Sequence, residues 1–241
     1  HEIPFQQSPY LQECLLLKTT HGNVAALEIF QKGHVSVQDP SASVAALLAR
    51  PRPGDRVIDV CSSPGGKTFF MAEMMEDTGE IVANDVYPSK IKLIEEGIQR
   101  LGLSCVRPSL CDGRALETDP ADVVFLDAPC SGLGVISKKP DIKWKRERED
   151  LAELLKLQRD LLDSAQKLVR PSGVLVYSTC TVEPEENIQM IQWFLDKYPE
   201  FEIEPADRYV PREMAKDGFY QSFQHLHYAD GAFGARLKKI R

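Results

Sequence analysis

From residue 57 onward, short apolar runs alternate with longer stretches in which apolar residues recur every three or four positions. The short runs are typical of buried strands, and the longer stretches are typical of amphipathic helices. Strands separated by helices favour an α/β fold with a mostly parallel sheet and helices on both of its faces. The pattern predicts strands at 57–60, 79–85, 105–110, 122–127, 174–177 and 232–240, the last one antiparallel, and helices at 67–76, 88–101, 148–169 and 184–197.

The beginning of the chain carries weaker patterns, and we interpret it as a lead-in segment. Residues 33–39 predict a short strand, and Asp39-Pro40-Ser41 predicts the start of a helix. The apolar run 11–17 fits either a helix or a buried strand. A break rich in proline and glycine follows at 51–54. We therefore expect a lead-in segment at 1–52 and one large domain at 53–241.

The stretch from Val57 to Thr68 carries the first functional signal, because a predicted strand there runs into Pro64-Gly65-Gly66 and then into a helix. Glycine lets the backbone turn sharply and approach a ligand closely. A glycine turn between a strand and a helix N-terminus is typical of nucleotide sites in doubly wound folds. The spacing matches neither the dinucleotide fingerprint nor the P-loop, since Cys61 stands where a P-loop needs glycine. A nucleoside ligand without a phosphate chain is favoured over ATP, and a tight turn with no ligand is the alternative.

Acidic residues follow the next predicted strands. Because ligands of parallel α/β sheets bind outside the carboxyl ends of the strands, we expect these acids on one edge. Asp85 lies 19 residues after Gly66, close to the offset at which an acid accepts hydrogen bonds from a ribose. Asp112 is placed to accept from an adenine amino group. Together these features indicate S-adenosylmethionine, whereas each acid alone is more often a helix cap or a solvated charge.

Two cysteines follow the fourth and fifth predicted strands, Cys130 in a Pro-Cys turn and Cys180 in a Thr-Cys turn. The C5 carbon of cytosine is too electron-poor to accept a methyl group unless a nucleophile first adds to C6. A thiolate suits this step because it is a strong nucleophile near neutral pH once its pKa is lowered. Asp127, three residues before Cys130, is placed to interact with N3 or the N4 amino group of the base. The alternative for each cysteine alone is a small, inert core residue.

Composition narrows the function classes. The 241 residues are 43% hydrophobic and 27% charged, which is typical of a globular protein. We expect neither a membrane span nor a signal peptide, although His1 indicates a trimmed start. The six cysteines lack zinc-site spacing, so we expect no metal and a cytoplasmic protein with reduced thiols. The net charge of −7 requires that any nucleic-acid binding use a local basic patch.

Six motifs follow one another along the chain. They are Asp59-Val-Cys-Ser-Ser-Pro-Gly-Gly-Lys67, Asp112-Gly-Arg114, Asp127-Ala-Pro-Cys-Ser-Gly132, Pro140-Asp-Ile-Lys-Trp144, Ser178-Thr-Cys180 with Pro184-Glu-Glu-Asn187, and Asp230-Gly-x-Phe-x-Ala-x-Leu-Lys238. Together they resemble the Sun/Fmu (RsmB-like) family of RNA cytosine-C5 methyltransferases. The resemblance covers about residue 35 to the end, and Val37-Gln38-Asp39-Pro40 is also similar to the family's lead-in to the first strand.

The resemblance implies a class I S-adenosylmethionine-dependent methyltransferase fold, which is Rossmann-like and has a mostly parallel seven-stranded sheet with an antiparallel last strand. It implies that Cys180 attacks C6, that Cys130 assists release of the methylated product, and that Asp127 lies between cofactor and base. It also implies that residues 53–241 are the catalytic domain. The cofactor site would comprise Cys61, Ser62, Ser63, Pro64, Gly65, Gly66, Lys67, Asp85, Asp112 and Asp127.

The resemblance also implies an RNA substrate with a flipped cytidine, most simply in 16S ribosomal RNA. Residues 137–148 surround Trp144 with six cations, which suit phosphate contacts and base stacking. A solvated helix start is the alternative for this loop. The cations are Lys138, Lys139, Lys143, Lys145, Arg146 and Arg148.

Bacterial members usually carry an N-terminal helical domain similar to the antitermination factor NusB, which these 241 residues do not include. We expect either a trimmed sequence, with 1–52 as the remnant of an RNA-binding subdomain, or a shorter relative with a different RNA target. Transfer RNA is an alternative substrate. Two competing hypotheses are DNA cytosine methylation, with Cys130 as the nucleophile, and a non-catalytic RNA-binding or ribosome-assembly module.

Overall fold

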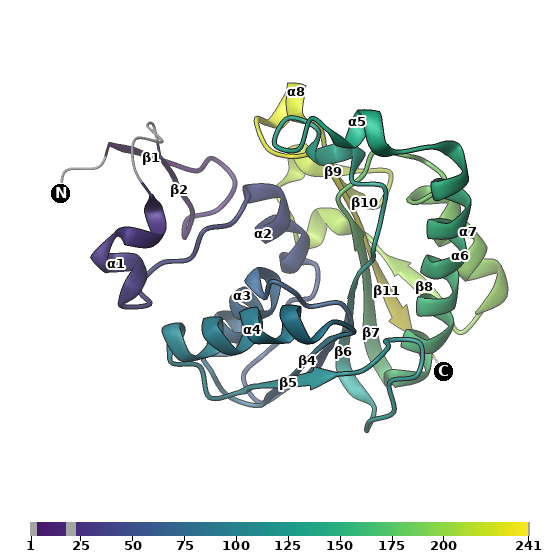
Figure 1. Ribbon diagram of the computed structural model, residues 1–241. Helices are drawn as coiled ribbons and strands as arrows, with labels where there is room; N and C mark the ends of the chain where they lie inside the picture. The colour runs from purple at the N-terminus through teal and green to yellow at the C-terminus, as the bar shows by residue number, and fades with distance from the viewer. Residues whose placement is uncertain (1–3, 18–22, 241) are drawn as a thin grey trace.

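A nine-stranded sheet forms the centre of the computed structural model, which describes residues 4–17 and 23–240 (Figure 1). The strands lie in the order β5-β4-β3-β6-β7-β11-β10-β9, and β8 pairs with the other end of β11. Their bounds are β3 Arg56–Asp59, β4 Glu80–Asp85, β5 Val106–Leu110, β6 Ala121–Asp127, β7 Val169–Thr179, β8 Phe201–Glu204, β9 Ala215–Lys216, β10 Phe219–Ser222 and β11 Ala232–Lys239.

The strand directions confirm the predicted topology. Strands β3 to β7 are mutually parallel, and β11 runs antiparallel to both β7 and β8. Seven of the strands, β5-β4-β3-β6-β7-β11-β8, therefore form the predicted sheet. The short strands β9 and β10 extend its edge, so the expected count of seven is too low for the whole sheet. They lie in the region 201–230, where short elements leave no periodic signal.

Helices cover both faces of the sheet, as the pattern predicted (Figure 1). One core cluster joins α2, α3 and α4 to one face, and a second joins α6 and α7 to the other. Because both faces are covered, the middle residues of the central strands are apolar, as in Val57-Ile58 of β3 and 123–126 of β6. The helix bounds are α2 Pro40–Leu47, α3 Gly66–Met74, α4 Pro88–Leu101, α6 Arg148–Ala165 and α7 Ile188–Lys197.

Local chemistry explains where the helices begin and end. Helix α4 matches its predicted range because Pro88 lies in the first turn and Gly102 adopts the left-handed conformation, with φ of 70°, after the last turn. Helix α6 begins at a capping box formed by Glu147 and Asp150. Helix α7 begins at Ile188 and not at 184, because residues 184–187 form a turn.

The lead-in segment differs from its prediction in one respect. Residues 35–39 form no strand, so the predicted strand at 33–39 is wrong. The Arg100 guanidinium instead holds the start of this segment in place, because it donates hydrogen bonds to the carbonyls of Phe30 and Val35 at 3.0 and 2.9 Å. Asp39 caps α2, as predicted, by accepting from the Ser41 N–H at 2.9 Å.

The remainder of the lead-in divides into two parts. Strands β1, Phe5–Gln7, and β2, Leu15–Leu17, form a separate two-stranded sheet near helix α1, Glu28–Gln31 (Figure 1). The apolar run 11–17 thus supplies a short strand, and that strand is mostly exposed. In contrast, α2 packs against the large domain, where Arg236 of β11 donates to the Ala49 carbonyl at 2.8 Å. None of the helices in the described ranges has the length and apolar character needed to cross a bilayer.

Candidate active site

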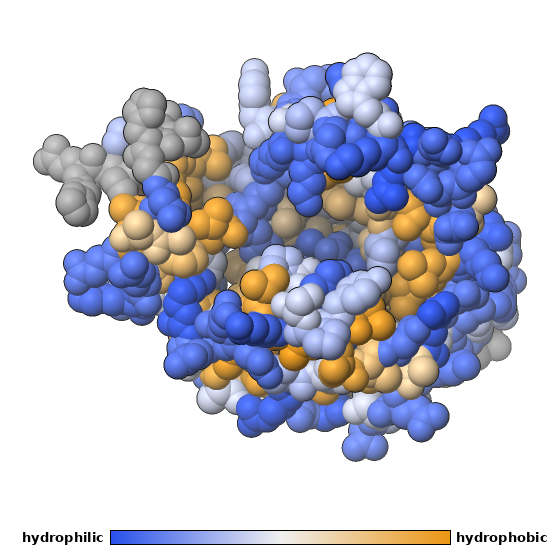
Figure 2. Space-filling model, viewed as in Figure 1, coloured by the Kyte–Doolittle hydropathy of each residue, from blue (hydrophilic) through white to orange (hydrophobic). Residues whose placement is uncertain are grey.

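The predicted site residues converge on one edge of the sheet, where the parallel strands have their carboxyl ends. Strand β3 leads into the turn 61–67, and the next three strands along the chain lead to Asp85, Asp112 and Asp127. Strand β7 ends one residue before Cys180. Figure 2 shows a hollow in the molecular face between the region of α3 and α4 and the loop that carries α5, Ile142–Lys145.

Cys130 and Cys180 face each other across the ends of β6 and β7, with 3.2 Å between their sulfur atoms. The sequence separates them by 50 residues, and the parallel pairing of the two strands brings them together. Backbone hydrogen bonds fix both turns: the Ala128 N–H donates to the Ser178 carbonyl at 2.8 Å, and the Gly134 N–H donates to the Cys180 carbonyl at 3.0 Å. Both thiols are free, and Cys180 is exposed.

The two thiols have opposite proton affinities. The hydrogen bond with Cys130 lowers the pKa of Cys180. The positive charge of Lys67 also lowers this pKa, whereas desolvation of the thiol raises it. The same hydrogen bond, together with burial, raises the pKa of Cys130 well above its ordinary value. Of the two thiols, Cys180 is therefore the one that loses its proton more readily, and Cys130 holds its proton more tightly.

A half-buried ion pair lies beside this thiol pair. Lys67 Nζ lies 2.6 Å from the Asp127 carboxylate, whose second oxygen accepts from the Ser178 hydroxyl at 2.7 Å. The sequence predicts Lys67 as part of the cofactor turn. In the structure its ammonium group contacts Asp127, and its charge lowers the pKa of Cys180. This contact fixes the Asp127 carboxylate between the glycine turn and the thiols.

The turn at 61–67 is shaped by its glycines and by hydrogen bonds to β4. Gly65 has φ of 107°, a left-handed conformation that side chains rarely adopt, and a Cβ there would lie 2.3 Å from the Phe69 ring. The Ser62 N–H and hydroxyl both donate to the Asn84 carbonyl, at 2.8 and 3.0 Å. These bonds hold the turn against the end of β4.

Asp85 and Asn84 end β4 and have different surroundings. Asp85 is buried, and among the described residues its carboxylate accepts only the Tyr87 N–H, at 3.2 Å, and lies 3.6 Å from Lys90 Nζ. A carboxylate has about four acceptor positions, so Asp85 retains capacity for further donors. The buried Asn84 amide donates to the carbonyls of Val60 and Cys111, each at 3.0 Å, and so joins the ends of three strands.

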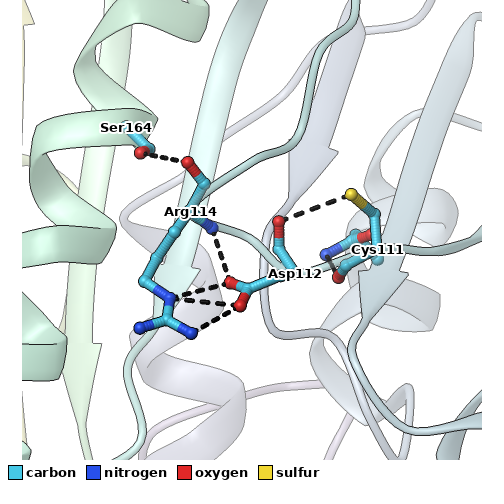
Figure 3. Close-up of polar contacts among 5 residues, drawn as sticks. Cys111, Asp112, Arg114 and Ser164 are labelled. Atoms are coloured by element: carbon cyan, nitrogen blue, oxygen red, sulfur yellow. Dashed lines mark hydrogen bonds and ion pairs between the residues drawn. The ribbon is translucent and has the colours of Figure 1, made fainter.

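Asp112 lies at the same edge, but its carboxylate is already engaged. Arg114 donates to both oxygens, through its backbone N–H at 2.9 Å and its guanidinium at 2.6 to 3.1 Å (Figure 3). These bonds lower the pKa of Asp112. The Arg114 carbonyl in turn accepts from the Ser164 hydroxyl of α6 (Figure 3). The structure thus gives Asp112 a role in shaping its loop, and any adenine contact must share this carboxylate with Arg114.

The sequence reasoning assigned no role to two buried acids that the structure places at the site. Asp59, at the end of β3, accepts from the Thr68 hydroxyl at 2.6 Å, while its second oxygen has no partner among the described residues. Burial raises the pKa of Asp59 to about 7. Glu186 belongs to a quoted motif, but only the structure shows that it lies beneath the cysteine turns. An acid inside an otherwise apolar strand was the available signal for Asp59.

The basic loop contributes fewer free cations than its sequence indicated. Lys138 pairs with both Asp39 and Asp230, and Lys145 pairs with Asp141. Trp144 is 80% exposed. A cavity of about 300 Å³ opens beside this loop and next to the Cys130 turn; it is lined by Ser131, Leu133, Lys143, Arg146, Glu147, Arg148, Leu151, Leu154 and Glu183.

The sheet order, the antiparallel β11 and the glycine turn after β3 are those of the class I fold of S-adenosylmethionine-dependent methyltransferases. The model of the family described as 16S rRNA methyltransferase RsmB/F matches residues 45–238. The chain belongs to this family, which confirms the resemblance seen in the motifs.

The names of similar proteins agree with this family. The chain is 36% identical over 231 residues to the probable ribosomal RNA small subunit methyltransferase B of Bacillus subtilis, covering 92% of this chain and 52% of the relative. It is 37% identical over 225 residues to the ribosomal RNA small subunit methyltransferase B of Vibrio cholerae, covering 88% and 51%. The chain therefore spans about half the length of these relatives.

Solved structures show the same fold. The crystal structure of PH0851 superposes with a TM-score of 0.92 at 34% identity, covering 98% of this chain and 54% of that one. The structure of NSun6 from Pyrococcus horikoshii with SFG, an analogue of S-adenosylmethionine, superposes with a TM-score of 0.83 at 32% identity, covering 91% and 57%.

Proposed function

We propose that this chain transfers a methyl group from S-adenosylmethionine to C5 of a cytidine in RNA, most simply 16S ribosomal RNA, through a covalent bond between Cys180 and C6. The observation that carries the proposal is the contact between the Cys130 and Cys180 sulfurs at 3.2 Å, beside the Asp127 carboxylate. The names of the relatives support ribosomal RNA as the substrate. The proposal places the protein in the cytoplasm, where ribosomal RNA is modified.

The cofactor supplies an electrophilic methyl group when it is bound. Residues 61–67 would hold it through their backbone, and Asp85, with unused acceptor positions, would bind its ribose hydroxyls. The unpartnered oxygen of the buried Asp59 supports this fit, because an orphaned buried acceptor needs a donor. Asp112 would complete the site through the carboxylate that it shares with Arg114.

Cys180 would attack C6 of the base. Its lowered pKa supplies thiolate near neutral pH, and its exposure gives a base access to the sulfur. Attack moves negative charge onto the pyrimidine ring, and Asp127 would interact with N3 or the N4 amino group as this charge builds. Lys67 and Ser178 hold Asp127 in one orientation for that contact.

The test of this function is methyl transfer to defined nucleic acids. With labelled S-adenosylmethionine and 16S ribosomal RNA, we expect the label to appear in 5-methylcytidine after digestion to nucleosides. Parallel reactions with transfer RNA and DNA distinguish the alternative substrates. Label in another nucleoside, or in no RNA at all, would contradict the assignment, and the second result would favour a non-catalytic binding module.

The basic loop is the proposed RNA contact. Among the ion pairs of the described residues, none involves Lys143 or Arg148, and both line the cavity beside the Cys130 turn. Lys143 Nζ also lies 4.9 Å from the centre of the Trp144 ring, which leaves an exposed aromatic face beside free charge. This arrangement suits phosphate contacts next to an extruded nucleotide.

Replacing Lys143 and Arg148 by glutamine is expected to weaken RNA binding about 10-fold at roughly 100 mM salt, because two phosphate contacts are lost. The slope of log Kd against log salt should fall in magnitude by about 1.5. Filter binding across a salt series measures both quantities. The matched control replaces the exposed Lys92 and Lys167, which lie on α4 and just beyond the end of α6, and should leave the slope unchanged. Equal slopes for the two double variants would remove the loop from the RNA interface.

A further inference from the structure

Glu186 is a fully buried carboxylate that lies beneath the two cysteine turns. It accepts three hydrogen bonds, from the Ser131 N–H at 2.8 Å, the Ser131 hydroxyl at 2.5 Å and the Gln158 amide at 2.8 Å. Donors of this kind suit a carboxylate, which only accepts. Among the ion pairs of residues 4–17 and 23–240, none involves Glu186. A buried acid without a cation is costly to a fold, so its presence requires an explanation.

The Glu186 carboxylate and the Gln158 amide together hold both neighbours of Cys130. Ser131, the residue after Cys130, is held through its N–H and its hydroxyl. The carbonyl of Pro129, the residue before Cys130, accepts from the same Gln158 amide at 2.9 Å. Glu186 and Gln158 therefore clamp the backbone on each side of the thiol. A buried network of this kind holds its members in a single arrangement.

The same network reaches the Cys180 turn. The hydroxyls of Ser131 and Thr181 lie 2.8 Å apart, and Thr181 follows Cys180 directly. The Tyr177 hydroxyl, on β7, donates to the Glu186 backbone carbonyl at 2.8 Å. The network thus links the two turns through buried hydrogen bonds, in addition to the contact between the two sulfur atoms.

The negative charge of Glu186 contributes to the raised pKa of Cys130, whereas Asp127 and Lys67 are the main charges that act on Cys180. The titratable groups around Cys130 are Cys180, Glu186 and Tyr177, while those around Cys180 are Cys130, Asp127 and Lys67. The hydrogen bond to Cys180 and burial raise the pKa of Cys130 most, and the negative charge of Glu186 adds to them. These effects favour Cys130 as the thiol of the pair that keeps its proton.

We propose that Glu186 is a positioning residue for the proposed methyl transfer: it holds the Cys130 and Cys180 turns in contact and keeps Cys130 as the thiol that donates to the Cys180 thiolate. The inference rests on the proposed function of the two cysteines. It assigns a role to a residue of the Pro184-Glu-Glu-Asn187 motif that neither the cofactor nor the base contacts in that proposal.

Glu186→Gln separates the charge from the geometry. The glutamine oxygen can keep the bonds from the Ser131 N–H and Gln158, and its amide can donate to the Ser131 hydroxyl, which turns to donate to Thr181. The variant removes the negative charge and can keep these three contacts. Glu185→Gln is the matched control, since Glu185 is the neighbouring acid of the same motif and is exposed.

The decisive readout is the pH dependence of Cys130 alkylation by iodoacetamide, followed by mass spectrometry in a Cys180→Ala background. Glu186→Gln is expected to lower the midpoint by about 1 pH unit, because a nearby negative charge is removed. Glu185→Gln should leave the midpoint unchanged. A residue that only stabilises the fold would not move this midpoint, so equal values with and without Glu186→Gln would overturn the proposal.

Ser131→Ala tests the geometry while the charge stays in place. It removes the hydroxyl that links Glu186 to Thr181, so we expect methyl transfer to slow about 10-fold with an unchanged Cys130 midpoint. An unchanged transfer rate would overturn the positioning role, and this variant decides the question if Glu186→Gln shows no cooperative thermal unfolding. The alkylation assay needs no RNA. A shifted midpoint in a protein that methylates no RNA would therefore refute the proposed function alone.

Discussion

Cys180→Ala is expected to abolish methyl transfer to RNA, with a loss of at least about 10³-fold, while cofactor binding stays intact. The reason is that C5 of cytosine becomes nucleophilic only after a group adds to C6, and the Cys180 sulfur is the exposed one with the lowered pKa. The measurement pairs methyl transfer from labelled S-adenosylmethionine with calorimetric titration of S-adenosylhomocysteine.

Cys14→Ala is the matched control for this experiment, because Cys14 is a free cysteine next to β2 in the lead-in segment. We expect it to retain the activity of the original chain. Full activity in the Cys180 variant would rule out a covalent mechanism through Cys180. Loss of both activity and cofactor binding would instead show that the substitution disturbs the whole site.

Cys130→Ala is expected to trap the enzyme on its RNA and to lower turnover by about 10²-fold. After methyl transfer, the proton on C5 must leave before the C6–sulfur bond breaks. The pKa of Cys130 is raised chiefly by its hydrogen bond to Cys180. That bond is lost once the Cys180 sulfur is bonded to carbon, so the pKa of Cys130 falls and its thiolate becomes available to accept the proton.

The trapped species is visible as a protein–RNA complex that survives denaturing electrophoresis. We expect the Cys130 variant to accumulate it with unmodified RNA and the original chain to show little. The double variant, which also lacks Cys180, should form none. Turnover at the original rate without accumulation would remove Cys130 from product release.

The part of the fold that controls the site was predictable because its signals are local. Apolar runs ending on Asp85 and Asp127 define buried strands, and parallel strands bring their carboxyl ends to one edge. The glycine turn is explicit in Pro64-Gly65-Gly66. The cysteine contact then follows from the pairing of β6 with β7, which places Asp127 opposite Ser178.

The errors and omissions concern contacts between residues distant in sequence. The segment 33–39 alternates like a strand, yet the guanidinium of Arg100 holds part of it as an irregular chain. The sequence predicts Lys138 as an RNA contact, but in the structure this lysine forms ion pairs with Asp39 and Asp230. The neighbours of Glu186 along the chain are partly exposed and partly buried. No periodic pattern therefore distinguishes the buried Glu186 from the exposed Glu185.

In the proposed mechanism, two neighbouring strand ends supply most of the reacting groups: the two cysteine sulfurs in contact and the oriented Asp127 carboxylate. The most direct test of this account uses RNA that carries 5-fluorocytidine at the target position, because fluorine blocks release and leaves the enzyme bound. Protease digestion and mass spectrometry then identify the residue attached to the base. The account predicts attachment at Cys180, and attachment at Cys130, or no covalent complex, would contradict it.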